Sequence, residues 1–420
     1  MAQLSDDCFA FGGELMRADA ALRLLNERVV AVTAAERVTL TAARGRILME
    51  DILSTRNVPP HDNAAVDGYA VFFDDLNPGA ETTLKVVGRV AAGQTLGHEA
   101  ARGTAVRVFT GAPMPPGPDT IFMQEDCRVD GNNVVLPPGI KRGANRRKLG
   151  EDIRQGAVIL HRGHRLRPQD VGLIASIGLT DVPVFRPLKV AIFSTGDELR
   201  DPGEPTPPGA VYDANRYALR AMLEQLGCAV QDYGILRDRL DTIRDTLARA
   251  AKDCDAIVTS GGMSTGEEDH VRAAVSALGS IHFWRLAIRP GRPVALGQVG
   301  HVPFVGLPGN PVAMMVTFLR FARPLLLGLA GANAKDREPH LFRVRAAFEI
   351  KKKHGRREWV RARLEPGPDG VPVAVKYPRD GAGILSSLVE SDGLIELPEE
   401  LTHAPADTMV DFLPFSEVAA

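Results

Sequence analysis

The sequence has few cysteines, few aromatic residues and no excess of one charge. Its four cysteines, at positions 8, 127, 228 and 254, are far apart and form no C-x-x-C pair, which excludes the usual zinc and dithiol motifs. Aromatic residues make up only 5% of the 420 positions, too few for a base-stacking surface. Lys and Arg number 50 and Asp and Glu 52, a net charge of -2, so we expect no nucleic-acid partner.

Other common signals are also missing. The most apolar stretch, 325–332, is far too short to span a bilayer, so we expect no membrane association. The first residues show neither a basic nor an apolar leader pattern, so we expect a cytoplasmic protein with reduced thiols. Neither G-x-x-x-x-G-K-[ST] nor G-x-G-x-x-G occurs, so ordinary P-loop and dinucleotide folds are not indicated. With 45% hydrophobic and 24% charged residues, the chain has the composition of a multidomain globular protein.

The first half of the sequence predicts a helix followed by a β-rich segment. Leu15, Ala18, Leu22, Leu25 and Val29 recur at spacings of three and four, which predicts one face of an amphipathic helix. Residues 55–145 contain short β-rich runs separated by glycine and proline. This pattern indicates a compact β module inserted into a larger unit.

From residue 188 strands and helices alternate. Buried strands are predicted at 188–195, 255–260 and 302–308, with helices over 217–226, 240–250, 271–278 and 312–326. Such alternation indicates βαβ units and a parallel sheet, and ligands bind such sheets at the carboxyl ends of the strands. After about residue 335 the sequence is again rich in β-forming residues, which predicts a small C-terminal β domain.

The first strand-end loop carries small donors followed by acids. Ser194, Thr195 and Gly196 can donate to a phosphate, and Asp197 and Glu198 can bind a hydrated cation. A capping turn uses the same residue types, and on this segment alone it is the better interpretation.

The second loop is rich in glycine. Its three glycines allow close approach of the backbone to a ligand, and the helix that follows would direct free N–H groups at an anion. A capping box from Ser264 to Glu267 is the alternative, but a cap does not need three glycines, so we favour anion binding. The candidate ligand-binding residues are Ser260, Gly261, Gly262, Ser264 and Gly266.

The same loop also matches G-x-S-x-G, the nucleophile elbow of serine hydrolases, at 262–266. A hydrolase would then use a later acid and histidine, for which Asp336 with His340 or His403 are available. The three acids at 267–269 would disfavour an oxyanion and favour a metal ion. We therefore rank this interpretation below the phosphate site.

The third loop, 306–311, and an arginine-rich turn complete the set. Pro311 suits the first helical turn with Asn310 as its cap, and Pro308 precedes them. Arg285, Arg289 and Arg292 surround a Pro-Gly turn and are fixed donors for an oxyanion, although an isolated run of this kind is usually a solvated loop. Together these loops predict one polyanion site with acids for a divalent cation.

The motifs in their order resemble the MoeA family, the molybdopterin molybdenumtransferases, which includes the E domain of gephyrin. The resemblance runs from about 11 to 415 and is specific through the order and spacing of its parts. They are DNAAVDGYAV, VFTGAPMPPG, GEDI, STGDEL, GAVYDANR, SGGMSTGEEDH, LAIRPGRP, GLPGNPV and GILSSL.

This resemblance implies an L-shaped homodimer of four-part subunits. It implies an α/β multidomain fold with a parallel α/β molybdopterin-binding domain, an inserted β module, a helical and β N-terminal domain and a C-terminal β-barrel-like domain. The implied boundaries are 11–54 with 146–187 for the N-terminal domain, 55–145 for the insert, 188–334 for the α/β domain and 335–420 for the C-terminal domain. The implied reaction is insertion of molybdate into adenylylated molybdopterin with Mg²⁺ and release of AMP. Molybdopterin adenylyltransferase and molybdoenzymes are the implied partners.

The resemblance also assigns residues. Glu198, Asp238 and Asp269 would lie near the metal and phosphates, and all three are the implied metal ligands. Arg292, Arg356 and Ser387 would hold molybdate. The partner subunit would contribute catalytic Asp67 and Asp152 with Thr110 and Arg147, and Arg285, Arg289, Pro308 and Pro311 would line the cleft.

Two departures and two alternatives remain open. Arg289 and Arg292 replace family lysines, which keeps the charge but changes the donor geometry, and Ala313 replaces a common serine. These changes leave the molybdate contacts open. One alternative is the related molybdopterin adenylyltransferase, which lacks the D-G-Y insert and the C-terminal β domain. The other is a non-catalytic molybdopterin-binding scaffold.

Overall fold

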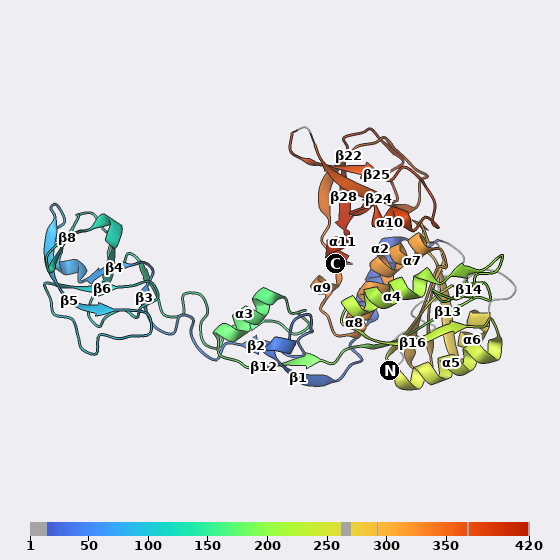
Figure 1. The fold of residues 1–420 in the computed structure, drawn as a ribbon, viewed down its shortest axis with the longest axis horizontal. Helices are drawn as coiled ribbons and strands as arrows, with labels where there is room; N and C mark the ends of the chain where they lie inside the picture. Colours follow the sequence, from blue (N-terminus) through green and yellow to red (C-terminus); the bar gives the residue numbers. More distant parts are fainter. Residues whose placement is uncertain (1–14, 262–269, 292, 368, 419–420) are drawn as a thin grey trace. The chain divides into compact units, whose positions relative to one another are not determined.

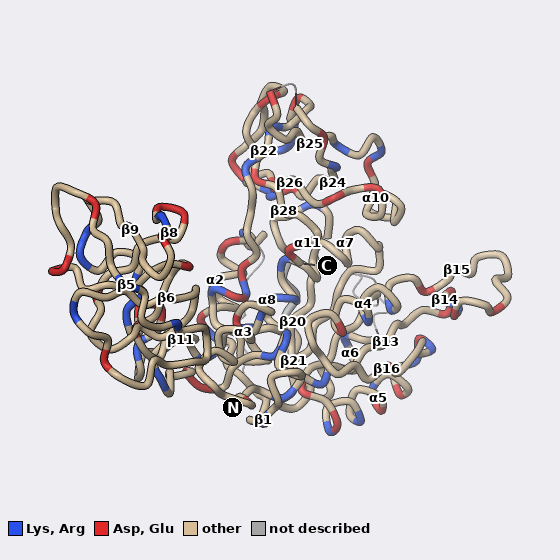
Figure 2. The backbone as a smooth tube through the Cα atoms, turned by 60° about the vertical axis from the view of Figure 1, so that its left-hand side comes forward, with Lys and Arg blue, Asp and Glu red and all other residues tan. Residues whose placement is uncertain are grey.

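The computed structural model describes residues 15–261, 270–291, 293–367 and 369–418, with the main chain alone at 282–285 and 293 (Figure 1). The chain forms two compact units. The larger contains the chain up to Glu50, Arg162–Arg167 and everything from Asp181 on, and the smaller contains Asp51–His161 and Pro168–Thr180. Lys and Arg are interspersed with Asp and Glu along the chain (Figure 2), and their numbers nearly balance.

The larger unit is built on a six-stranded sheet of order β16-β13-β17-β21-β20-β18. The first four strands are parallel and the last two are antiparallel additions at one edge. The strands are β13 (Lys189–Thr195), β16 (Ala229–Leu236), β17 (Ala256–Ser260), β18 (Gly279–Arg285), β20 (Pro293–Val299) and β21 (Val302–Leu307). The three predicted strands are confirmed, while β16, β18 and β20 were not predicted.

Alternation of side chains along the sheet creates two cores. Val190 and Ile192 of β13 pack into one cluster of buried apolar side chains, and Ala191 and Phe193 pack into another. Period-two alternation places these pairs on opposite faces of the sheet, so helices cover both. The first face carries α4 (Ala214–Gln225), α7 (Pro311–Thr317), a π-helical turn η4 (Phe318–Ala322) and α8 (Arg323–Leu329). The second carries α5 (Leu240–Asp253) and α6 (His270–Leu278).

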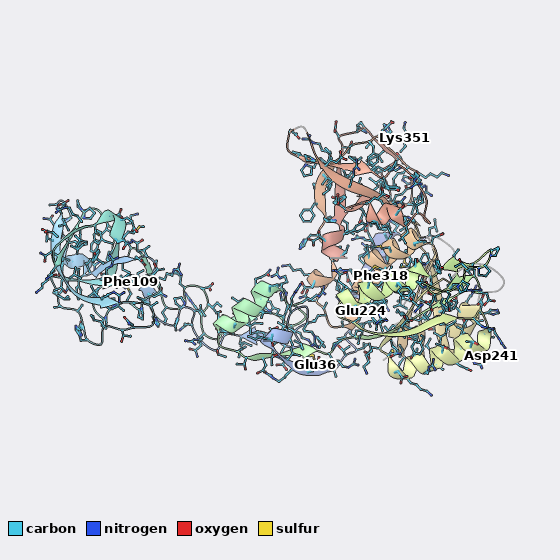
Figure 3. The ribbon with its side chains drawn as sticks, viewed as in Figure 1. Glu36, Phe109, Glu224, Asp241, Phe318 and Lys351 are labelled. Atoms are coloured by element: carbon cyan, nitrogen blue, oxygen red, sulfur yellow. The ribbon has the colours of Figure 1, made fainter. Side chains whose placement is uncertain are left out.

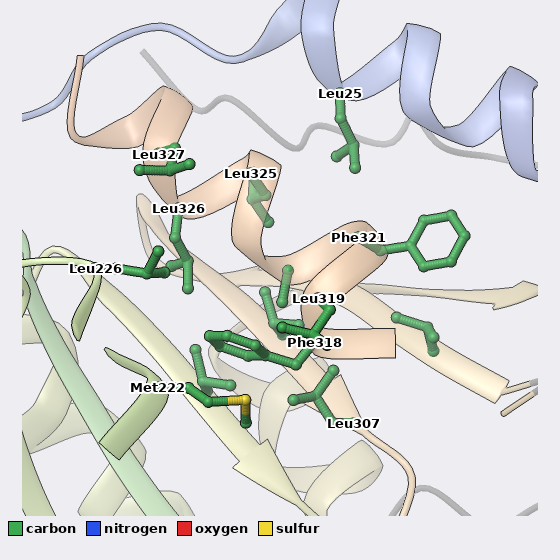
Figure 4. Close-up of a cluster of buried hydrophobic side chains, with 14 of the residues drawn as sticks. Leu25, Met222, Leu226, Leu307, Phe318, Leu319, Phe321, Leu325, Leu326 and Leu327 are labelled. Carbon is green, nitrogen blue, oxygen red and sulfur yellow. The ribbon is translucent and has the colours of Figure 1, made fainter. Parts of the chain in front are cut away.

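The helical run Pro311–Leu329 is long and apolar enough to cross a membrane by length and composition, but 94% of it is buried inside the protein. Figure 4 shows Phe318, Phe321 and Leu325 of this run packed near Leu25 of α2 (Ala18–Arg28) and Met222 of α4. It is therefore the central helix of a protein core.

The N-terminal helix is shorter than predicted. It begins at Ala18, and its buried residues are Ala18, Ala21 and Leu25. Leu15 lies before the helix with 42% of its surface exposed, so its assignment to the buried face was wrong. The spacing was helical, but the main chain of Met16 already pairs with Leu286 in an extended bridge, which delays the helix start.

The C-terminal part of the larger unit is a closed five-stranded barrel. Its strands are β22 (Phe342–Ala346), β24 (Arg357–Pro366), β25 (Pro372–Lys376), β26 (Gly393–Leu397) and β28 (Met409–Pro414), and pairing of β24 with β26 closes it. The short strand β19 (Ile288–Arg289) runs parallel to β24 and joins the barrel to the α/β sheet. Smaller elements are β1 (Ala35–Thr39) paired with β12 (Asp181–Phe185), β14 (Leu199–Arg200) with β15 (Val211–Tyr212), β23 (Ile350–Lys351) with β27 (His403–Ala404), η1 (Leu40–Ala42), α9 (Ala334–Arg337), α10 (Ser386–Val389) and α11 (Phe415–Val418).

The smaller unit contains the predicted β module. Its six-stranded sheet has the order β7-β4-β6-β5-β9-β8. The strands are β4 (Gly68–Val71), β5 (Thr82–Val90), β6 (Thr104–Val108), β7 (Thr120–Met123), β8 (Arg128–Asp130) and β9 (Asn133–Leu136). The other elements are β2 (Ile52–Leu53) paired with β11 (Val158–Leu160), β3 (Asn63–Ala64) with β10 (Arg146–Arg147), η2 (Phe73–Asp75), η3 (Gln124–Asp126) and α3 (Pro168–Ser176).

Candidate functional site

The parallel strands reverse their order between β13 and β17. In chain order the sheet runs second, first, third, fourth, so the connections leave β13 and β17 in opposite directions. Open α/β sheets bind ligands at such a switch point, outside the carboxyl ends of the strands. Ser194 pairs in register with Ser260, and Ser260 with Leu307, so the three predicted loops begin at this same edge.

Glycines bring the three loops into close approach. Gly261 has φ +92, and a Cβ added there would lie 3.4 Å from the Thr195 carbonyl oxygen of the first loop. A Cβ added at Gly309 of the third loop would lie 3.7 Å from the Cα of Gly261. The Gly261 N–H also donates to the Leu307 carbonyl at 3.1 Å. The first, second and third loops are therefore side by side.

A side chain that sequence reasoning did not assign ties two of these loops together. Asn215 Nδ2, in the first turn of α4, donates to Ser260 Oγ at 2.8 Å and to the Gly309 carbonyl at 2.7 Å. Ser260 Oγ in turn donates to the Pro308 carbonyl at 3.2 Å. The only sequence signal was the position of Asn215 in the GAVYDANR motif, directly after the helix cap Asp213.

Ser194 has hydrogen-bonding capacity that the described residues do not use. It is 1% exposed at the carboxyl end of β13, and its Oγ has no partner among the described residues. Buried hydroxyls are normally paired, so a free one at a strand-end edge indicates a place for a ligand. Thr195 is also buried, and Gly196 follows with φ +146.

Carboxylates stand at the same edge. A Cβ added at Gly196 would lie 2.5 Å from Glu198 Oε2, so this carboxylate rests against the glycine backbone. The Asp238 N–H, after β16, faces Asp197 Oδ1 at 3.4 Å, which brings the loops after β13 and β16 together.

These acids fit magnesium as partial ligands. No three of the described His, Cys, Asp and Glu residues stand close enough to form a metal cage. Mg²⁺ keeps several waters and commonly takes one or two protein carboxylates together with substrate phosphates, so the Glu198 carboxylate could serve as one ligand without a cage, and Asp238 reaches this edge through its main-chain N–H. Asp269, the third predicted ligand, lies outside the described residues, as do Gly262, Ser264, Gly266 and Arg292.

The third loop starts α7 as predicted, with one difference. Pro311 occupies the first helical turn, and Asn310 stands at the N-cap position. The Asn310 side chain makes no capping hydrogen bond, so its expected role as a cap was wrong. The neighbouring Val312 N–H donates to the Ala382 carbonyl at 2.9 Å, which links this loop to the barrel.

Two of the predicted arginines meet through a glutamate. Arg356 Nε lies 2.8 Å from Glu358 Oε1, and Arg289 Nη1 lies 3.5 Å from Glu358 Oε2. Both arginines line a cavity of about 500 Å³ where β19 meets the barrel, next to Gly381 and Ala382. Ala382 therefore links the lining of this cavity to the start of α7, directly after the third loop.

Two further predicted residues are Ser387, expected to hold molybdate, and Arg285, expected to line the cleft. Ser387 in α10 is fully buried, and its Oγ donates to the Ile384 carbonyl at 2.5 Å rather than lining the cavity. Arg285 is the last residue of β18.

In the smaller unit Asp67 and Thr110 form a pair. Asp67 Oδ1 accepts hydrogen bonds from the Thr110 N–H at 2.8 Å and from Thr110 Oγ1 at 2.7 Å. These bonds, the main-chain one first, hold the pKa of the Asp67 carboxyl below its ordinary value of 3.8. The guanidinium of Arg107 assists from nearby, stacked 5.2 Å from the ring centre of Phe109, which Figure 3 labels.

Arg147 and Asp152 form a second group in the smaller unit. Both line a cavity of about 470 Å³ with Val58, Pro59 and Glu151. The Asp152 N–H donates to the Val58 carbonyl at 3.0 Å, which fixes the position of this turn. The smaller unit thus contains the Asp67 carboxylate, oriented by two hydrogen bonds, and a separate pocket lined by one arginine and two carboxylates.

The candidates for a serine hydrolase have other partners. Asp336 Oδ2 lies 3.3 Å from His164 Nδ1 and accepts from the Arg165 N–H, and His403 pairs with Glu349. The G-x-S-x-G segment itself lies outside the described residues. Nothing in these contacts favours a triad.

Comparison with known proteins identifies the family. The sequence matches the MoeA N-terminal region (domain I and II) over residues 16–178, a probable molybdopterin binding domain over 191–328, and the MoeA C-terminal region (domain IV) over 343–415. It is 36% identical to a molybdopterin molybdenumtransferase of Haemophilus influenzae, over 96% of this chain and 100% of that protein. The chain belongs to the MoeA family.

Other MoeA relatives agree. A molybdopterin molybdenumtransferase from a Nostoc species is 35% identical over 90% of this chain and 89% of its own. The crystal structure of a molybdopterin biosynthesis MoeA protein from Pyrococcus horikoshii superposes with a TM-score of 0.82 at 29% identity, covering 96% of this chain and 100% of that one. The MoeA-like multidomain fold predicted from the motifs is therefore confirmed, and the chain is an enzyme of molybdenum cofactor biosynthesis.

Proposed function

We propose that this chain is a molybdenum insertase that joins molybdate to adenylylated molybdopterin, requires Mg²⁺ and releases AMP. The observation that carries this proposal is the convergence of three glycine-containing loops at the switch point, beside the buried Ser194 hydroxyl, which has no partner among the residues that the structure describes. Main-chain N–H groups and hydroxyls at such an edge suit the phosphates of a nucleotide-linked ligand.

The residues at the sheet edge then have distinct roles. Ser194, Thr195 and Gly196 would bind phosphate oxygens, and Asn215 would keep the second and third loops at a fixed separation. Glu198, Asp238 and Asp269 would hold Mg²⁺. Bound there, the cation would neutralise negative charge that develops as the phosphoanhydride bond breaks. Thiolate ligands for molybdenum would come from the pterin, which agrees with the absence of a cysteine motif.

The arginine-lined cavity would hold molybdate. Arg289 and Arg356 line it, and Arg292 belongs to the same turn in the sequence. The contact between Val312 and Ala382 supports this arrangement, because it places the cavity directly beside the third loop. A fixed guanidinium is a strong donor to a tetrahedral oxyanion.

We also propose that two copies share each site and that the enzyme works in the cytoplasm. Asp67, Thr110, Arg147 and Asp152 would then complete the site of the partner subunit. The half-buried, deprotonated Asp67 carboxylate supports this, because its hydrogen bonds with Thr110 fix its orientation and no described cation lies within ion-pair distance of it. The described cysteines, Cys127, Cys228 and Cys254, are free thiols, as a reducing compartment requires.

The direct test supplies adenylylated molybdopterin, molybdate and Mg²⁺ and follows AMP. Molybdate-dependent AMP release supports the proposal, and its absence from a folded wild-type protein contradicts it. Glu198→Gln and Asp269→Asn should keep the fold and lose Mg²⁺-dependent AMP release. Formation of adenylylated product from molybdopterin and Mg-ATP would instead indicate the adenylyltransferase, and tight pterin binding without either reaction would indicate a scaffold.

Sharing of the site has its own test. Asp67→Asn and Glu198→Gln are each expected to be inactive alone. If they are unfolded together and refolded as mixed dimers, one site in each heterodimer regains both native residues, so about a quarter of wild-type activity should return. No recovery in verified heterodimers would show that both residues act within one subunit.

A further inference from the structure

The cavity beside β19 is lined with more positive than negative charge. Its lining includes six basic and three acidic side chains, and Figure 3 labels one of them, Lys351, on the barrel. The basic residues are Arg289, Lys351, Lys352, Arg356, Arg361 and Lys376, and the acidic ones are Glu349, Glu358 and Asp380. A cavity with such an excess of positive charge favours an anionic occupant.

The acids are already paired with other cations. Glu358 is shared by Arg356 and Arg289, and Lys351 lies 2.8 Å from Glu349. Lys376 lies 3.0 Å from Asp380. These contacts account for the three carboxylates of the lining.

The remaining two cations differ from one another. Lys352 Nζ donates to main-chain carbonyls, at 2.7 Å for Leu401 and 3.3 Å for Glu399, so its head group is held by the barrel. The side chain of Arg361, on β24, has one described hydrogen bond, from Nη2 to the Arg379 carbonyl at 3.1 Å. No described carboxylate lies within ion-pair distance of it.

Arg361 is buried and incompletely satisfied. It is 7% exposed, and its Nε has no partner among the described residues. Burial lowers the pKa of this guanidinium, with nearby Asp380 opposing and Arg289 adding to the effect. Burial of a charged donor without a partner is unfavourable, and such groups are rare unless a ligand uses them.

We propose that Arg361 binds a tetrahedral oxyanion in this cavity, molybdate in the proposed reaction, together with Arg289. The identity of the anion rests on the proposed function, whereas the anion site itself rests on the geometry. The main chain of Arg361 is fixed, because its carbonyl accepts from the Tyr377 N–H at 2.9 Å, and its guanidinium is held by the hydrogen bond from Nη2 to the Arg379 carbonyl. The guanidinium is therefore preorganised to meet the anion rather than ordered by it.

Isothermal titration calorimetry with sodium molybdate tests this directly. Arg361→Gln should weaken molybdate binding roughly 10- to 100-fold, the range expected for loss of charged hydrogen bonds. Arg363→Gln is the matched control, because Arg363 lies two residues further on the same strand, is 62% exposed and pairs with Glu365. It should bind molybdate as the wild type does. Equal affinity in Arg361→Gln and wild type would overturn the proposal.

Thermal unfolding separates a binding role from a structural one. If Arg361 serves the anion, Arg361→Gln without molybdate should melt no lower than wild type, because it removes an unsatisfied buried charge. A large fall in melting temperature, in step with lost binding, would show a structural role instead. If the Gln variant does not fold, Arg361→Lys decides, since it keeps the charge but lacks Nε. Wild-type affinity in that variant would overturn the role of Nε.

Competition identifies the source of the oxyanion. Molybdate that is displaced by tungstate but not by AMP supports the assignment, whereas displacement by AMP would assign Arg361 to the nucleotide phosphate and overturn it. If the wild type releases AMP but its molybdate binding does not depend on Arg361, only the role proposed for Arg361 is wrong. If molybdate binding depends on Arg361 but the wild type never releases AMP, the proposed function is wrong and the anion site still stands.

Discussion

The side-chain amide of Asn215 donates a hydrogen bond of 2.8 Å to Ser260 Oγ. The same amide nitrogen reaches the Gly309 carbonyl at 2.7 Å, so one side chain sets the separation of the loops after β17 and β21. Asn215 begins α4, whose cap Asp213 accepts from the Arg216 N–H. The helix start thus positions two loops of the proposed ligand site.

Asn215→Ala should raise KM for adenylylated molybdopterin and lower kcat/KM roughly tenfold, the effect of losing about one to two hydrogen bonds. Asn215→Asp should be worse, because its carboxylate would face the Gly309 carbonyl without a proton to donate. Steady-state AMP release measures both. Asn26→Ala, on an exposed amide that bonds Glu338, is the control and should be neutral. A wild-type KM in Asn215→Asp would contradict the positioning role.

Thr110→Val should raise the pKa of Asp67. The variant removes the Oγ1 donor but keeps the main-chain N–H, so the pKa should move toward 3.8 and remain below it. A ¹³C NMR titration of the Asp67 carboxyl carbon measures this. Thr83→Val, at an exposed position of β5, should leave the value unchanged. No upward movement in Thr110→Val would show that Oγ1 does not stabilise the charged form.

The same shift fixes the sign of the pH dependence. The folded pKa of Asp67 is lowered, so its contribution to stability is present above the unfolded value and is lost as pH falls through the folded value. Melting of the wild type should therefore fall below about pH 4 more steeply than that of Thr110→Val. Circular dichroism melts between neutral and acid pH would detect a difference in slope.

Sequence reasoning found the parts of the site that depend on strand ends. β13, β17 and β21 are continuous apolar runs, and fully buried parallel strands produce such runs. The loops that follow them had to meet at one edge, and the structure brings Thr195, Gly261 and Gly309 into contact distance. The reversal of strand order that makes this edge a crevice could not be read from the runs alone.

The missed features depend on tertiary placement. β16 is an edge strand with a mostly half-exposed pattern, so it lacks the apolar run that marked its neighbours. In the sequence Arg361 is one of several arginines in a β-rich segment and stands two positions before Arg363. The two residues lie on the same face of β24, yet Arg361 is 7% exposed and the Arg363 side chain is 62% exposed, a difference that the sequence pattern does not indicate. Asn215 is ordinary at a helix start, and its two acceptors are distant in sequence.

Gly196→Ala should weaken Mg²⁺ binding, because the added Cβ would displace the Glu198 carboxylate without removing its charge. A Cβ at this position would lie 2.5 Å from Glu198 Oε2, and φ +146 is unfavourable for alanine. We expect the Mg²⁺ concentration for half-maximal AMP release to rise several-fold and stability to fall by about 1 kcal/mol. Gly209→Ala is the control, because its φ of +89 carries similar strain with nothing within 4 Å. If the two variants need the same Mg²⁺ concentration for half-maximal AMP release, Glu198 does not bind the metal.

Arg216→Met should destabilise the larger unit by about 3–5 kcal/mol, the usual result of removing one partner from a buried ionic group. Arg216 is 7% exposed and contacts the carboxylates of Asp213 at 3.0 Å, Asp232 at 2.6 Å and Asp201. Without it the nearly inaccessible Asp213 carboxylate loses its counter-charge, and the start of α4 that carries Asn215 loses its anchor. Urea unfolding followed by circular dichroism measures the change. Arg220→Met, one turn further on and paired with exposed Glu224, should cost no more than about 0.5 kcal/mol. Equal losses in the two variants would mean that the buried group is no stronger than a surface pair.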